Sequence, residues 1–167
     1  MKARIIAKFI LKNVLPAIAI VVLLFSIPIA IFYYRSLWKG SADYDGFGTD
    51  YANIMNCVRN YTADNYGTVE DKLYMVSKEG IYDYEAKVYL DFTDAAKESF
   101  SAIRTTAFKD LEYIKVQGNR LLFCAGTGRY AVVYSPNTDP KWYVDGKELR
   151  IDSKRICVDW YHVRRIE

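Results

Sequence analysis

An uncharged apolar run at residues 14–34 constrains this chain more than any other feature of its sequence. The run reads VLPAIAIVVLLFSIPIAIFYY, 21 residues in which Ser26 is the one hydrophilic residue. As a helix it would be roughly 31 Å long, close to the hydrocarbon core of about 30 Å. A helix at the surface of a soluble domain would show a polar stripe, and this run has none. The sequence therefore predicts an N-terminal transmembrane helix.

The flanks of this run predict its orientation. Residues 1–13 form a basic flank with four Lys or Arg side chains, and two more basic residues follow the run. Because basic flanks are retained on the cytoplasmic side, we expect the N-terminus in the cytoplasm and the remaining chain outside it. Aromatic and basic side chains at both ends are suited to the membrane interface. The expected interface anchors are Lys8, Lys12, Tyr33, Tyr34, Arg35, Trp38 and Lys39.

A cleaved signal peptide is the alternative for this segment. Gly40-Ser41-Ala42 offers a small-residue cleavage pattern after a basic start. The apolar run, however, is longer than the roughly 7–15 residues of a signal sequence, and the possible cleavage site lies well beyond its end. We therefore expect an uncleaved anchor, a short flexible stalk at residues 35–46 and one domain at residues 47–167.

Hydrophobic spacing predicts the elements of this domain. Apolar residues at steps of 4, 3, 4 and 3 predict a helix from Phe47 that ends before Gly67. Residues 73–77 and 81–90 read as a hairpin, in which Tyr82, Tyr84, Ala86, Val88 and Leu90 share one face while Asp83, Glu85 and Lys87 lie on the wet face.

The second half of the domain reads as one more helix followed by strands. Thr93 or Asp94 would cap a helix with Ala96, Phe100, Ile103 and Ala107 on its buried face. Strands are expected at residues 111–117, 120–125, 129–134, 142–144, 147–149 and 155–164. The predicted fold class is α+β, with two helices packed on an antiparallel sheet in the order helix, hairpin, helix, meander.

Charge and composition argue against several function classes. Residues 1–42 contribute +6, and the rest of the chain holds 17 basic against 20 acidic residues. The domain thus lacks the basic face that nucleic-acid binding needs. Cys57, Cys124 and Cys157 are too widely spaced for a zinc site, so we expect three buried thiols, or one disulfide as the alternative.

Candidate catalytic residues have simpler interpretations. His162 is the only histidine and lies in an expected strand, which favours a structural role. Gly126-Thr127-Gly128 precedes a strand rather than a helix, so it predicts a hairpin turn and not a phosphate loop. The sequon at Asn60 falls in an expected helix. Of the 15 tyrosines, 13 follow the apolar run, where they suit half-buried strands or a binding surface.

These patterns predict no catalytic, cofactor-binding or metal-binding residue. We expect a single-pass membrane protein with a non-enzymatic, extracytoplasmic domain for binding, sensing or assembly. The lipid bilayer is its expected partner, and another envelope or membrane protein is a further candidate. A membrane-tethered hydrolase using paired carboxylates is the alternative, because sequence spacing does not reveal acids that converge in space.

Overall fold

A computed structural model of the chain describes residues 20, 22–32, 42–68, 71–125 and 128–166. The chain divides into two compact units, residues 1–37 and 38–167. In the first unit, residues 22–32 are helical. The nine large apolar side chains described in this unit, Ile20 among them, are each 52–76% exposed. The hydroxyl of Ser26 donates to the carbonyl of Leu23 within this helix.

No helix among the described residues has both the length and the apolar character to cross a membrane. The other residues of the expected span and all seven expected interface anchors lie outside the described residues.

The second unit begins on the domain itself. Ala42 is 2% exposed and forms a β-bridge with Phe108, and the backbone N–H of Asp43 donates to Ala107 O at 2.6 Å. The last residues of the expected stalk therefore pack on the domain, because Ala42 is small enough to enter the core. Helix α3 (Gly48–Tyr66) follows at once. A Cβ atom at Gly48 would lie 2.8 Å from the Tyr44 hydroxyl, so a larger residue there would require the Tyr44 ring to shift.

Both expected helices of the domain are confirmed. Helix α3 buries Tyr51, Ile54 and Val58 and ends at Gly67, whose φ of +67° suits glycine. Thr93 caps helix α4 (Asp94–Ala102) by accepting a hydrogen bond from the N–H of Ala96. A π-helical turn, η2 (Ile103–Ala107), continues α4, and the four expected core residues of this helix are all buried.

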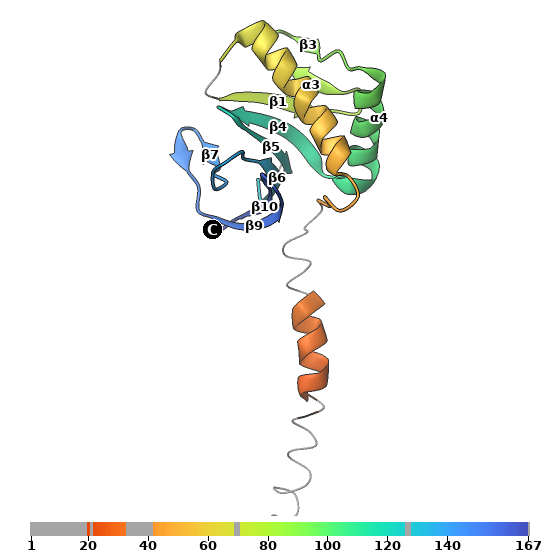
Figure 1. The fold of residues 1–167 in the computed structure, drawn as a ribbon, viewed down its shortest axis with the longest axis vertical. Helices are drawn as coiled ribbons and strands as arrows, with labels where there is room; N and C mark the ends of the chain where they lie inside the picture. The colour runs from red at the N-terminus through yellow and green to blue at the C-terminus, as the bar shows by residue number, and fades with distance from the viewer. Residues whose placement is uncertain (1–19, 21, 33–41, 69–70, 126–127, 167) are drawn as a thin grey trace, which may run out of the picture. The chain divides into compact units, whose positions relative to one another are not determined.

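The α+β class is likewise confirmed, since eight strands form one antiparallel sheet in the order β3-β2-β1-β4-β5-β6-β10-β9. The helices α3 and α4 lie against one face of this sheet (Figure 1). The strands are β1 (Lys72–Val76), β2 (Ile81–Asp83), β3 (Val88–Tyr89), β4 (Leu111–Gln117), β5 (Arg120–Ala125), β6 (Tyr130–Tyr134), β9 (Ile151–Cys157) and β10 (Trp160–Arg165). A separate hairpin pairs β7 (Tyr143–Val144) with β8 (Lys147–Glu148) around Asp145-Gly146, as expected.

The strand expected at residues 81–90 was wrong in its length and its faces. The chain turns at residues 84–87, so β2 and β3 form a hairpin of their own. Asp83, expected on the wet face, is fully buried, whereas Tyr84 is 66% exposed. The reason is local: the Asp83 carboxylate accepts hydrogen bonds from the N–H groups of Glu85 and Ala86, which closes the turn.

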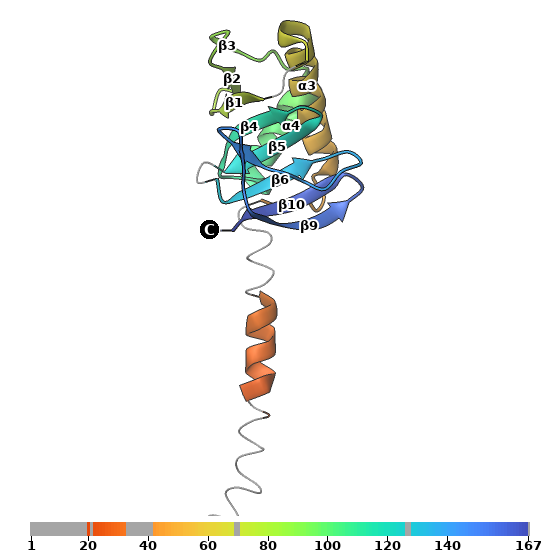
Figure 2. The same cartoon turned by 90° about the vertical axis from the view of Figure 1, so that its left-hand side faces the viewer.

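The C-terminal strand expected at residues 155–164 is also two strands. β9 and β10 meet at a tight turn through Val158 and Asp159, and Asp159 has a φ of +62°. The apparent alternation through Val158 is misleading, because this side chain lies at the turn and is 71% exposed. Figure 2 shows β10 and β9 side by side at the end of the sheet.

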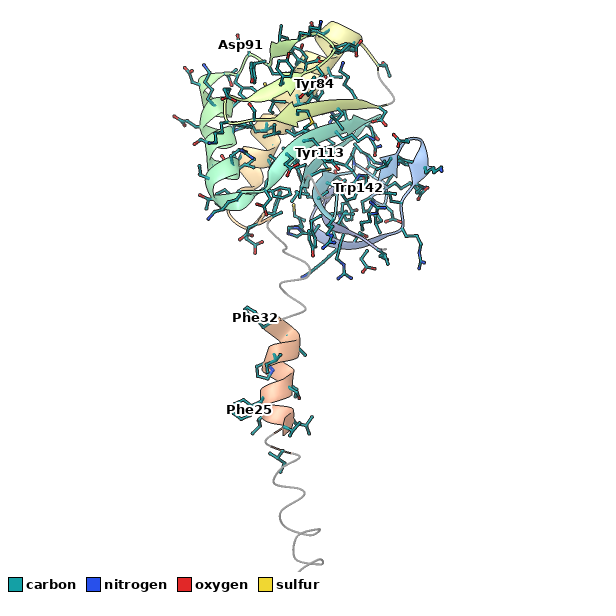
Figure 3. All side chains as sticks on the ribbon, turned by 180° about the vertical axis from the view of Figure 1, so that it is seen from behind. Phe25, Phe32, Tyr84, Asp91, Tyr113 and Trp142 are labelled. Atoms are coloured by element: carbon teal, nitrogen blue, oxygen red, sulfur yellow. The ribbon has the colours of Figure 1, made fainter. Side chains whose placement is uncertain are left out.

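Each face of the sheet carries its own hydrophobic core. The larger core lies between the helices and the sheet and includes Tyr51, Tyr74, Phe123 and Trp160. The smaller core covers the opposite face around Trp142, with Leu122, Cys124, Ala131, Val133 and Val163. Figure 3 shows Tyr113 and Trp142 on this second face. The domain is therefore a sheet that is covered on both sides.

Candidate functional site

A groove runs along the outward side of α3 and has a volume of about 520 Å³. One wall is the helix itself, and the other is the segment at residues 89–95 that joins β3 to α4. The helix wall carries Asn53, Asn56, Asn60 and Asp64 at steps of 3, 4 and 4, which places them on one face. We call this groove, between α3 and residues 89–95, the α3 groove. A smaller groove of about 350 Å³ lies where the C-terminal end of α3 approaches Gly118 and Asn119.

Two asparagines on the helix wall are available to a ligand. The side-chain amides of Asn56 and Asn60 are exposed and make no hydrogen bond within the described part of the chain. Asn53 lies three residues before Asn56. Its side-chain amide donates to the Ser99 hydroxyl at 3.0 Å and so connects α3 to α4. Each free amide offers two donor hydrogens and an acceptor oxygen. The middle of the groove can therefore both donate and accept hydrogen bonds.

In the second wall, at residues 89–95, buried and exposed side chains alternate along the first four residues. Leu90 and Phe92 point into the core, so Tyr89 and Asp91 are exposed. The Cys57 thiol lies 3.7 Å from Asp91 O and joins the two walls. Burial, together with the negative charge of Asp91, raises the pKa of this thiol. Cys57 therefore stays protonated at neutral pH and is a poor nucleophile.

The charged residues that line the α3 groove are all acidic. Its lining includes Asp64 and Asp91 but no Lys, Arg or His. Anionic ligands would meet repulsion there and no cationic group to pair with. The groove is thus suited to neutral or cationic ligands.

A buried ionic network lies beside the groove, where α3 ends over β1 and β2. Asp83 accepts from the Tyr66 hydroxyl at 2.6 Å and lies 3.4 Å from Lys72 Nζ. Lys72 also contacts Glu85 at 2.7 Å and lies 3.4 Å from the centre of the Tyr66 ring. We call Tyr66, Lys72, Asp83 and Glu85 the Asp83 network. It joins the end of α3 to the edge of the sheet.

The pKa directions in this network describe a structural ion pair. Burial alone would raise the pKa of Asp83, but hydrogen bonds from Tyr66 and from two backbone N–H groups, with the charge of Lys72, lower it. Burial alone would lower the pKa of Lys72, but the bonds to Glu85 and Tyr66 and the charge of Asp83 raise it. Burial and the nearby Asp83 raise the pKa of Tyr61 to about 12. A general acid at neutral pH would need the opposite shift of its carboxyl pKa.

The tyrosines divide between core and surface. Tyr51 and Tyr74 are fully buried, and the Tyr74 hydroxyl bonds to that of Thr62 at 2.8 Å. Tyr82, by contrast, packs edge-on against both Tyr84 and Tyr89 at 5.0 Å between ring centres, at the β2–β3 end of the sheet. Tyr89 connects this cluster to the α3 groove, because it also lines the groove. Tyrosines therefore occur both in the core and at the surface of the domain.

Of the other candidate residues, His162 and Gly128 lie apart from the groove, whereas Asn60 lines it. His162 is 9% exposed on β10, within the sheet. Gly128 follows β5 with a φ of +59° and precedes the antiparallel partner β6, which confirms a hairpin turn; Gly126 and Thr127 lie outside the described residues. Asn60 of the sequon lies within α3, as expected. Among the described residues, no three His, Cys, Asp or Glu side chains form a cluster that could hold a metal ion.

The cysteines differ from one another more than the sequence indicated. All three thiols are free: Cys124 is buried, Cys57 is half-buried and Cys157 is exposed. The expectation of three buried thiols therefore holds for Cys124 but not for half-buried Cys57, and it was wrong for Cys157, which lies at the end of β9 beside the exposed turn. Its thiol lies 3.5 Å from the Tyr44 hydroxyl.

Comparisons with protein-family models, with curated proteins and with solved structures found no match to this chain. The function must therefore be argued from the geometry of the α3 groove. Sequence reasoning missed this groove, because its second wall comes from a segment about 30 residues further along the chain. The signal available in the sequence was the run of asparagines at helical spacing.

Proposed function

We propose that this chain is a single-pass membrane protein whose α+β domain binds a ligand outside the cytoplasm. The observation that carries the binding function is the α3 groove, with two unpaired amides facing a volume of about 520 Å³. A groove of this size lies within the range of ligand sites, which are about 300–1,000 Å³. The domain acts by binding, and the chain carries no catalytic step in this proposal.

The anchor in this proposal is the apolar run at residues 14–34. Its length matches the bilayer core, and the helical residues 22–32 present only apolar side chains besides Ser26. The excess of basic residues before the run supports a cytoplasmic N-terminus. The lipid bilayer is then the first partner, and the ligand or a second envelope protein comes to the domain from outside the cytoplasm.

A binding screen with a blocked groove tests this function. The full chain in lipid nanodiscs would be screened by ligand-observed NMR against neutral saccharides, short peptides and anionic metabolites. Asn60→Trp fills the middle of the groove, and Asp110→Trp places the same ring on an exposed turn elsewhere. We expect at least one ligand class to bind the wild type and Asp110→Trp but not Asn60→Trp. A screen in which no binding depends on position 60 would contradict the proposed function.

A further inference from the structure

The α3 groove has a chemistry that narrows its ligand, and this step rests on the proposed binding function. Asn56 and Asn60 are one helical turn apart and both are unpaired, so two neighbouring amides face the same volume. Amides pair equally well with a group that donates and a group that accepts. A hydroxyl does both, and a row of hydroxyls matches a row of amides.

The acidic residues of the groove lining argue against an anionic ligand. Asp64 and Asp91 are the charged residues in the groove lining, and both are acidic. A phosphate or carboxylate ligand would lose its hydration without gaining a cationic partner. A neutral ligand with many hydroxyls meets no such penalty.

The walls of the groove also disfavour a peptide. An extended peptide adds to a free strand edge, but one wall is a helix, whose backbone N–H groups are already paired. An amphipathic helix needs a row of apolar anchor pockets, whereas the helix wall of this groove is mainly amide and acid.

The length of the groove indicates more than one sugar ring. Asn53 and Asp64 are eleven residues apart on α3, which corresponds to roughly 16 Å along the helix axis at 1.5 Å per residue. We propose that the α3 groove binds a neutral oligosaccharide, held by the Asn56 and Asn60 amides. The shared chemistry is a chain of neutral, hydroxyl-bearing sugar rings.

Calorimetry with defined sugars tests this ligand class. The probes are chitotetraose and maltotetraose, the corresponding monosaccharides N-acetylglucosamine and glucose, inositol hexaphosphate, and a neutral Gln/Ser-rich nonapeptide. The protein is the full chain in phosphatidylcholine nanodiscs. We expect one tetrasaccharide to bind at least tenfold more tightly than its monosaccharide. Tighter binding of chitotetraose would assign the amides to acetamido sugars, and tighter binding of maltotetraose would assign them to plain hydroxyl sugars.

Paired variants locate the site. The double variant Asn56→Ala/Asn60→Ala should weaken tetrasaccharide binding at least tenfold and leave the thermal unfolding midpoint unchanged, because both side chains are exposed. Asn119→Ala removes an amide from the smaller groove and should leave binding unchanged. Weakening by Asn119→Ala in place of the double variant would overturn the proposal.

Other outcomes separate this proposal from the binding function itself. If the nonapeptide or inositol hexaphosphate binds in an Asn60-dependent way and no sugar does, the ligand class is wrong but the binding function stands. If none of the probes and none of the wider screen binds, both proposals are contradicted. A monosaccharide that binds as tightly as its tetrasaccharide would also overturn the oligosaccharide assignment.

Discussion

At the scale of single residues, Asp83 shows how a buried charge can hold a fold together. Its carboxylate is fully buried, yet it accepts three hydrogen bonds and faces the Lys72 ammonium at 3.4 Å. A buried ion of this kind is tolerated only when its hydrogen bonds and its partner replace the lost water. The same side chain ends β2 by closing the turn that follows it. One residue thus sets both the local turn and the contact to α3.

Replacement of this residue should be costly. Asp83→Asn is expected to lower the free energy of unfolding by roughly 1–3 kcal/mol at pH 7, because Lys72 loses its buried counter-charge and keeps only the exposed Glu85 as a partner. Chemical denaturation of the full chain in nanodiscs, followed by far-UV circular dichroism, measures this change. Asp110→Asn, on an exposed turn, is the matched control and should stay within about 0.5 kcal/mol.

The same residue predicts a pH dependence. The pKa of Asp83 is lower in the folded domain than in an unfolded chain, so the ionised carboxylate stabilises the fold. This contribution is complete above an unfolded pKa of about 3.9 and is lost as the pH falls through the lower folded pKa. Wild type and Asp83→Asn should therefore differ most at neutral pH and converge at strongly acidic pH. A difference that stays constant down to pH 2 would contradict the ionic role.

At the scale of elements, the hairpin β7–β8 and its approach segment cover the second face of the sheet. Trp142 is 1% exposed and packs with Cys124 and Val133. Lys115 Nζ and Gln117 Nε2 both donate to Tyr143 O, at 2.9 and 3.1 Å, and so hold the segment to β4. The indole Nε1 of Trp142 is buried with no hydrogen-bond partner among the described residues. Packing is therefore the main contribution of this side chain.

Two substitutions separate packing from hydrogen bonding at this position. Trp142→Ala should lower the free energy of unfolding by roughly 3–5 kcal/mol, the usual cost of removing a large buried aromatic ring. Trp142→Phe keeps most of the ring and loses no bond, so it should cost less than about 1.5 kcal/mol. Urea denaturation followed by far-UV circular dichroism compares the two. Equal costs for both variants would contradict this expectation, because they would show that the benzene ring alone recovers none of the packing.

The elements also show what the sequence could and could not predict. Helices α3 and α4 and strands β4 and β5 were found at nearly their observed bounds, because their apolar spacing reflects burial on one face. The β2–β3 and β9–β10 turns were missed, because Asp83 and Val158 reverse the usual link between polarity and exposure. The α3 groove could not be predicted in full, since tertiary packing alone brings Asp91 beside Cys57.

At the scale of the whole molecule, we propose that a membrane anchor is joined to a ligand-binding domain. Charge supports this division: the first 42 residues carry +6 and the remaining residues −3. In this proposal the acidic domain would not be drawn to an anionic membrane surface, so its groove would stay available to a ligand in the surrounding water. The orientation of the anchor decides on which side of the membrane that ligand must be found.

Labelling of Cys157 tests this orientation most directly. Cys157 is the exposed thiol of the domain, whereas Cys124 is buried and Cys57 is half-buried. Cells with an intact plasma membrane would be treated with a membrane-impermeant maleimide, and the full chain recovered from the membrane fraction, with Cys157→Ser as the control. We expect the membrane-bound wild type to be labelled in intact cells and Cys157→Ser to lose this label. Labelling of Cys157 only after the membrane is opened would contradict a domain outside the cytoplasm.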